Sequence, residues 1–156
     1  MTSLEDRLSR LSRLNTVAIE ARAAASGMTA SEAAVLGMLA RVGPVLSPTR
    51  LQVLVIQSPG GLTKTLRRLE GAGLVRRRAD PDDRRSLLVE LTAKGRRASE
   101  GTSAAVGAHY DEVLAGLDAG ERATLDELLG HLLDRLEEAT GHGPALVPDG
   151  QGGHRR

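Results

Sequence analysis

Residues 58–91 read SPGGLTKTLRRLEGAGLVRRRADPDDRRSLLVEL. This order of residue types predicts a short helix, a glycine stop and a two-stranded hairpin with a charged tip. Ser58 can cap the helix, and Pro59 suits its first position because the amide there has no partner in a helix. Gly71 and Gly73 can supply the positive φ that ends it. The remainder of the chain is expected to position this unit.

The predicted helix has an apolar side and a cationic side. At about 100° per residue, one face carries three leucines: Leu62, Leu66 and Leu69. The opposite face carries three cations, Lys64, Arg67 and Arg68, and Gly60 leaves that face uncrowded near its start. A charged outer face by itself is as consistent with solvated surface as with a binding site.

The charge of the surrounding residues favours a binding site. Residues 64–97 hold 11 Lys/Arg and 5 Asp/Glu, a net charge of +6, whereas the whole chain has a formal net charge of +1. The remainder of the chain is therefore acidic. A basic patch on a helix and a hairpin, within an otherwise acidic chain, is typical of nucleic-acid binding.

The order of motifs along this stretch resembles the MarR family of bacterial transcription regulators. The resemblance rests on residues 60–63, 66, 68–70 and 73–77, on Asp80-Pro81, on Asp83-Arg84-Arg85, and on Leu91-Thr92 with Gly95. It implies a mainly α fold with a small β-hairpin wing, that is, a winged helix-turn-helix with N- and C-terminal dimerisation helices. It also implies a dimer that binds operator DNA, with the helix in a major groove and the wing in an adjacent minor groove.

The side chains of the helix suggest a division between reading and anchoring. We expect Thr63, Lys64 and Arg67 to contact base edges, where an Arg can make a bidentate contact to guanine. Arg68 is expected to meet a phosphate, which fixes register without reading sequence. The amides of residues 58–61, which include those of Ser58, Gly60 and Gly61, lie at a helix N-terminus and suit a phosphate.

The wing has its own expected contacts. Arg76 is expected to meet a phosphate, Arg85 to enter the minor groove and Arg84 to touch the backbone. Asp83 is expected to hold Arg85 extended by ion pairing. An alternative role for Asp83 is turn formation, because Asp and Pro cluster here, and both roles can hold together.

Composition restricts the remaining possibilities. The chain has 156 residues with one Tyr and no Phe, Trp or Cys, so the core must be built from Leu, Val and Ala. The absence of Cys excludes disulfides, thiolate metal ligands and the cysteine-based peroxide sensing of some MarR relatives. No apolar run approaches the roughly 20 residues of a membrane span, and the N-terminus lacks a signal-peptide pattern, so we expect a cytoplasmic protein.

Helical periodicity and capping residues divide the rest of the chain. Helices are expected over residues 4–25, from the capping box at Thr29 to about Arg41, from Ser47 to about Ile56, after Thr92, and after the capping box at Asp118. The run after Ser47 is rich in β-branched residues and could also form a strand. The predicted organisation is a dimerisation region at residues 1–28 and 93–140, a DNA-binding domain at residues 29–92, and a disordered tail at residues 141–156.

The first and last helices each carry an apolar stripe. The stripe of the last helix comprises Leu125, Leu128, Leu129, Leu132, Leu133 and Leu136. It could belong to an ordinary core, but a small winged domain has too little surface to cover both terminal helices. We therefore expect a homodimer interface.

An enzyme and an architectural DNA-binding protein are the two alternatives to a sequence-specific regulator. An enzyme is not favoured, because phosphate-loop and dinucleotide-binding glycine motifs are absent and the four histidines form no His-x-x-x-His pair for zinc. No cofactor or metal is expected. An architectural DNA-binding protein without effector control stays open, although a helix suited to base reading argues against it.

The MarR resemblance further implies control by a small anionic or phenolic ligand, bound between the dimerisation helices and the winged domain. Met28, Met38, His109 and Tyr110 could line such a cleft. Each could equally serve simple packing. The sequence does not distinguish a repressor from an activator.

Overall fold

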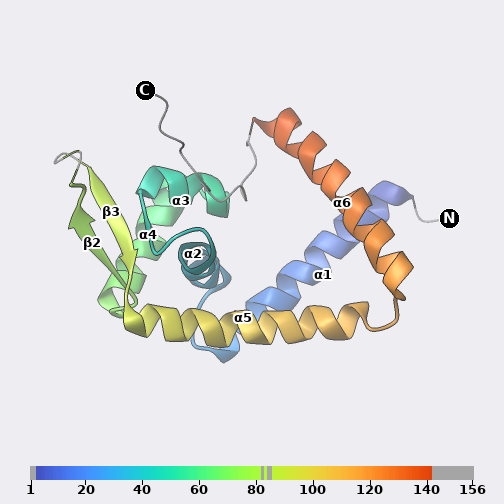
Figure 1. Cartoon of the computed structure of the whole chain (residues 1–156), viewed down its shortest axis with the longest axis horizontal. Coiled ribbons are helices and arrows are strands. Elements are labelled where there is room, and N and C mark those ends of the chain that lie inside the picture. The colour runs from blue at the N-terminus through green and yellow to red at the C-terminus, as the bar shows by residue number, and fades with distance from the viewer. Residues whose placement is uncertain (1–2, 82, 84–85, 142–156) are drawn as a thin grey trace, which may run out of the picture.

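The computed structural model describes residues 3–81, 83 and 86–141. Its elements, in chain order, are α1 (Leu4–Ala25), α2 (Ala30–Arg41), β1 (Val45–Leu46), α3 (Pro48–Val55), α4 (Pro59–Gly71), β2 (Val75–Ala79), β3 (Leu87–Leu91), α5 (Ala93–Leu114) and α6 (Ala119–Thr140). The middle of the chain forms a lobe from α2, α3, α4 and the strands. The long helix α5 leaves this lobe, and α1 and α6 lie beyond it (Figure 1).

Polar side chains start all six of these helices. In each case the residue before the helix accepts a hydrogen bond from the backbone amide three residues on; these residues are Ser3, Thr29, Ser47, Ser58, Thr92 and Asp118. Such caps satisfy amides that the first turn leaves free. The predicted starts are confirmed, and the segment after Ser47 is a helix rather than a strand.

The sheet has one strand more than the sequence predicted. Strands β2 and β3 form the expected antiparallel hairpin, but β1 pairs with the other side of β3, which gives the order β1-β3-β2. The prediction of a two-stranded hairpin was therefore incomplete. A two-residue strand is too short to show the alternation by which strands are recognised in a sequence.

The glycine stop after α4 uses one of the two glycines proposed for it. Gly73 adopts a φ of +69°, and its amide donates to the Glu70 carbonyl oxygen at 2.9 Å. Gly71 remains in the helix, so its predicted role in ending the helix was wrong. At the end of α3, Ile56 adopts a φ of 49°, a left-handed conformation that is costly for a β-branched residue.

The hydrophobic core lies entirely within the lobe. Its buried members are aliphatic: Val35, Leu36, Leu39, Leu51, Leu62, Leu66, Leu69, Leu74, Val75, Val89 and Leu91. They come from α2, α3, α4, β2, β3 and the turn before β2. The core therefore holds α4 by its leucine face, as the sequence predicted, and turns the opposite face of that helix outward.

The first turn of α5 is fixed against the chain reversal that follows α4. The Thr92 hydroxyl lies 2.8 Å from the Gly73 carbonyl oxygen and 3.0 Å from that of Leu74, and the Lys94 ammonium donates to the Ala72 carbonyl oxygen at 2.8 Å. Gly95 is buried against the same turn. These contacts join the long helix directly to the end of α4.

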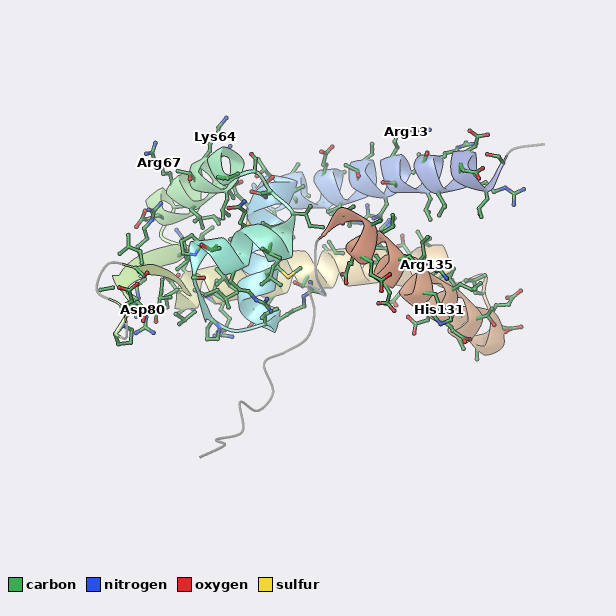
Figure 2. The ribbon with its side chains drawn as sticks, turned by 90° about the horizontal axis from the view of Figure 1, so that it is seen from above. Arg13, Lys64, Arg67, Asp80, His131 and Arg135 are labelled. Carbon is green, nitrogen blue, oxygen red and sulfur yellow. The ribbon has the colours of Figure 1, made fainter. Side chains whose placement is uncertain are left out.

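The terminal helices bury little of their own surface. In α1 the buried residue is Ala23, and no described residue of α6 is buried. The large exposed apolar side chains on them include Leu11, Leu14, Val17, Leu128, Leu133 and Leu136. The two helices overlap in Figure 1, but Figure 2 shows them apart. Each thus presents an uncovered apolar stripe.

The length and apolarity of each helix can be compared with those of a membrane span. Within the described part of the chain, no single helix is long and apolar enough to cross a membrane. Helices α1 and α2 pass a length and composition test only when taken together, and they are bent by 84° relative to each other.

Gly95→Ala should destabilise the protein. A Cβ at this position would overlap the Leu74 carbonyl oxygen and lie 2.9 Å from the Leu74 carbonyl carbon. Overpacking of this kind costs about 1–3 kcal/mol. Gly101→Ala is the matched control on the same helix, because nothing lies within 4 Å of its added Cβ. That variant should gain up to about 1 kcal/mol from helix propensity. Urea unfolding followed by circular dichroism measures both, and equal stability of the two variants would contradict the close approach.

Candidate nucleic-acid interface

Helix α4 presents its cationic side to solvent because its other side is in the core. Ser58 accepts from the Gly61 amide at 3.2 Å, and Pro59 occupies the first turn. Thr65 is buried beside the leucines and satisfies its hydroxyl by donating to the Gly61 carbonyl oxygen at 3.0 Å. The leucine pattern did not predict Thr65 as a core residue, because a polar side chain interrupts that pattern.

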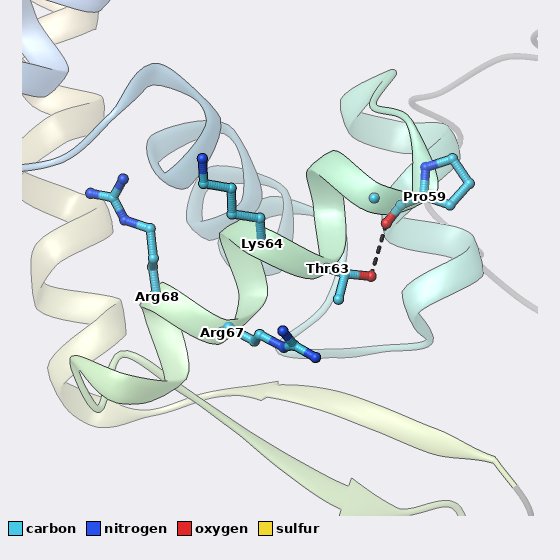
Figure 3. A pocket seen from close by; sticks show the side chains of 6 residues that line it. Pro59, Thr63, Lys64, Arg67 and Arg68 are labelled. Carbon is cyan, nitrogen blue, oxygen red and sulfur yellow. Dashed lines mark hydrogen bonds between the residues drawn. The ribbon is translucent and has the colours of Figure 1, made fainter.

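Lys64 and Arg67 are the exposed cations of α4 that have no acidic partner. Their side chains project away from the lobe (Figure 2), and neither forms an ion pair within the described residues. They border a shallow hollow on α4, lined by Pro59, Gly60, Thr63, Lys64, Arg67 and Arg68 (Figure 3). Both keep all their donors available for a ligand in front of the helix.

Thr63 and the helix start contribute less donor capacity than the sequence suggested. The Thr63 hydroxyl donates to the Pro59 carbonyl oxygen at 2.8 Å (Figure 3), so it can offer a ligand only its lone pairs and its methyl group. Among residues 58–61, Pro59 has no amide hydrogen and the Gly61 amide is taken by Ser58. The amides of Ser58 and Gly60 remain as candidate donors in the described structure.

Arg68 differs from its neighbour Arg67 because it is tied to another helix. Its Nε lies 3.0 Å from Oε1 of Glu32, whose side chain is only 8% exposed. The other carboxylate oxygen of Glu32 accepts from the Thr29 amide at 2.7 Å and the Thr29 hydroxyl at 2.8 Å. This pair links the start of α2 to α4. Sequence reasoning identified Glu32 only as part of a capping box, because the contact with Arg68 spans 36 positions.

The three consecutive arginines of β2 also have acidic partners. Arg76 makes a bidentate contact to Glu90 on β3, with distances of 3.0 and 2.8 Å, and Arg78 Nε lies 3.7 Å from the same carboxylate. Arg77 Nε lies 3.3 Å from Glu70 at the end of α4. The hydrogen bonds from Arg76 lower the pKa of Glu90, and the pKa of Arg76 is raised in return. Arg76 was expected to meet a phosphate, and Glu90 holds it in this structure.

The wing tip is described only in part. The Asp83 carboxylate accepts from the Ser86 hydroxyl at 2.7 Å, and its carbonyl oxygen accepts from the Ser86 amide at 2.9 Å. These contacts support the turn-forming role of Asp83. Arg84 and Arg85 lie outside the described residues, as does Asp82. The expected pairing of Asp83 with Arg85 therefore stays a prediction.

The four candidate effector residues fall into two groups. Met28 and Met38 are partly buried and pack against the core. His109 and Tyr110 lie on α5 with their ring centroids 5.5 Å apart, and the Tyr110 hydroxyl donates to Asn15 on α1 at 2.9 Å. The hollow on α4, a second one at the start of α6 and a third between α2 and α4 include none of these four. The described residues contain no cluster of three or more His, Asp or Glu suited to a metal.

Known proteins share this arrangement. A sequence model of the MarR family matches residues 26–86. An HTH-type transcriptional repressor of Mycobacterium tuberculosis is 36% identical over 106 residues, which cover 68% of this chain and 76% of that protein. The chain belongs to the MarR family. Its relatives in this family are transcriptional regulators, so the chain is classed as a regulator of transcription and not as an enzyme.

Two further proteins support the assignment. An uncharacterised HTH-type transcriptional regulator of Bacillus subtilis is 31% identical over 113 residues, which cover 72% of this chain and 68% of that protein. A mutant of MarR from Escherichia coli, solved in complex with operator DNA, superposes with a TM-score of 0.72 at 29% identity and covers 83% of this chain and 93% of that one. The mainly α winged-helix fold is thus a MarR fold.

Arg68→Ala should lower stability, whereas Arg67→Ala should leave it unchanged. The first change removes a charge-assisted partner from the buried Glu32 carboxylate, which should cost about 1–2 kcal/mol. The second removes an exposed side chain with no ion-pair partner in the described structure, and such changes stay within about 0.5 kcal/mol. Urea midpoints measure both variants. An equal, small effect of the two would mean that the Arg68–Glu32 pair does not secure α4.

Proposed function

We propose that the protein is a homodimeric, sequence-specific repressor that binds a pseudo-palindromic operator and responds to a small ligand. The observation that carries this proposal is the outward face of α4, where Lys64 and Arg67 have neither core contacts nor an acidic partner in the described structure. The MarR membership of the chain and the operator complex of its E. coli relative support DNA as the ligand. The activity would be exerted on DNA in the cytoplasm.

Each recognition helix would enter one major groove, and the two grooves would be about 34 Å apart. Lys64 and Arg67 would donate to base edges, while Thr63 would accept or make a methyl contact. The amides of Ser58 and Gly60 would meet a phosphate. At the wing, Arg85 would enter the minor groove with Asp83 as its orienting partner, and Arg84 would touch the backbone.

A second copy of the chain is the proposed cover for the stripes on α1 and α6. Leucines that remain exposed on a helix favour association, because burial removes apolar area from water. The two helices also differ in charge. Arg7, Arg10 and Arg13 are exposed on α1, whereas Asp126, Glu127 and Asp134 are exposed on α6. Packing of α1 against α6 of a second copy would bring opposite charges together.

The proposal also includes repression and control by a small ligand. The M. tuberculosis relative is named a repressor, and we propose the same role here. We propose that a small anionic or phenolic effector binds near Met28, Met38, His109 and Tyr110. In a dimer this region would be closed by the terminal helices, so that a ligand there would change the distance between the two copies of α4. An architectural protein without effector control is the alternative.

Arg67→Ala should weaken binding to the operator by about 1–3 kcal/mol and reduce discrimination at one base pair in each half-site. We expect random duplex to lose much less affinity, because base contacts carry the discrimination. Fluorescence anisotropy with the upstream DNA of the protein's own gene and with a scrambled duplex measures both. Equal affinity of the wild type for the two duplexes would contradict sequence-specific regulation and favour the architectural alternative.

Leu129→Asp together with Leu133→Asp should convert the dimer to a monomer. Placing carboxylates in an apolar interface costs several kcal/mol, because an unpaired charge would be buried there. His131→Asp is the control, since it adds a carboxylate to α6 outside the leucine stripe and should leave the dimer intact. Sedimentation at micromolar concentration distinguishes the species. A wild-type protein that is monomeric in this range would rule out the proposed interface.

A further inference from the structure

Ion pairs divide the cations of the basic stretch into two groups. Arg76 and Arg78 share the carboxylate of Glu90, Arg77 contacts Glu70, and Arg68 contacts Glu32. Lys64 and Arg67 form no ion pair within the described residues. Of the nine Lys and Arg residues of this stretch that the structure describes, four are thus engaged by carboxylates.

Strand register places Glu90 directly opposite Arg76 and diagonally opposite Arg78. Arg76 lies directly opposite Glu90 across the β2–β3 ladder, and Arg78 lies two positions further along the same face of β2. Side chains in such direct and diagonal positions are within reach of each other. Glu90 is also paired through its backbone with Val45 of β1, so it lies in the central strand of the sheet. The position of Glu90 in the central strand restricts its carboxylate. The Glu90 side chain is 21% exposed, whereas the Arg76 side chain is 68% exposed.

Glu90 accepts hydrogen bonds from two donors of Arg76 that a phosphate could use, and its carboxylate lies 3.7 Å from Nε of Arg78. An Arg guanidinium binds carboxylate and phosphate through the same bidentate geometry. Phosphate contacts increase affinity for every DNA sequence alike, through the release of counterions. The ion pair with Glu90 therefore lowers the attraction of Arg76 and Arg78 for DNA phosphates, whatever the DNA sequence. It does not affect Lys64 and Arg67.

We propose that Glu90 is a specificity-determining residue that competes with DNA phosphates for Arg76 and Arg78, and so limits the affinity of the wing for non-operator DNA. The inference rests on the proposed DNA-binding function and adds a regulator of its specificity. The competition matters most where phosphate contacts supply nearly all of the affinity, as they do on non-operator DNA. Operator binding would tolerate the competition because base contacts supply additional affinity.

Glu90→Gln is the direct test, because it keeps the shape of the side chain and removes its charge. Binding to random duplex is measured by fluorescence anisotropy across a salt series. We expect affinity for random duplex to rise about three- to tenfold at low salt, with the slope of log K against log salt steeper by about 1–2. Operator affinity should rise less, so the ratio of operator to random affinity should fall.

The same substitution in an Arg76→Gln/Arg78→Gln background separates competition from simple repulsion. Competition predicts that the two arginine changes cost little affinity while Glu90 is present, and that they abolish the gain caused by Glu90→Gln. A gain that persists without the arginines would mean that Glu90 only repels DNA, and the proposal would be wrong. Glu100→Gln on the exposed side of α5 controls for net charge, and an equal gain from that variant would also overturn it.

Different results would contradict the proposed DNA-binding function and the proposed competition by Glu90. Loss of operator preference in the wild type would contradict sequence-specific regulation, whereas the competition is read on random duplex alone. Thermal melts verify that each variant folds. If Glu90→Gln does not fold, the arginine changes alone decide the question: a large loss of random-duplex affinity from Arg76→Gln/Arg78→Gln in the wild-type background would show that Glu90 does not occupy them.

Discussion

The contact between Gly95 and the turn after α4 is the constraint on which the arrangement depends. Only a residue without a side chain lets α5 begin against the Leu74 carbonyl, and Thr92 and Lys94 then bind the carbonyl groups of that turn. The end of α4 and the start of α5 are therefore joined through this one turn. A displacement at the start of α5 would therefore act on the turn that ends α4.

The buried hydrophobic core and the exposed apolar stripes lie in different parts of the chain. Aliphatic side chains of the lobe form a closed core around Leu36, Leu51 and Leu69, which are at most 1% exposed. Within the described residues, the leucines of α6 have no such cover. The lobe can thus hold its shape, while the terminal helices keep apolar surface that the described part of the chain does not cover.

Structural features that depend on residues close together in the sequence were predicted. Features that depend on residues far apart in the sequence were missed. Caps such as Thr29 and Asp118 and the leucine spacing in α4 identified the helices, because each signal lies within one or two turns. Strand β1 and the partners of Arg68 and Arg76 were not found, since the acceptors Glu32 and Glu90 lie 36 and 14 positions away from the two arginines. Charge counting alone located the basic stretch but treated occupied and available cations alike.

The bond between Tyr110 and Asn15 gives the protein a built-in optical probe. Tyr110 is the only Tyr in a chain without Trp or Phe, and its hydroxyl donates to Asn15 at the contact between α5 and α1. All intrinsic aromatic emission therefore originates at this one contact. Its intensity and accessibility to quenchers report how the first helix sits on the long helix, in unlabelled protein and without interference from any second fluorophore in the chain.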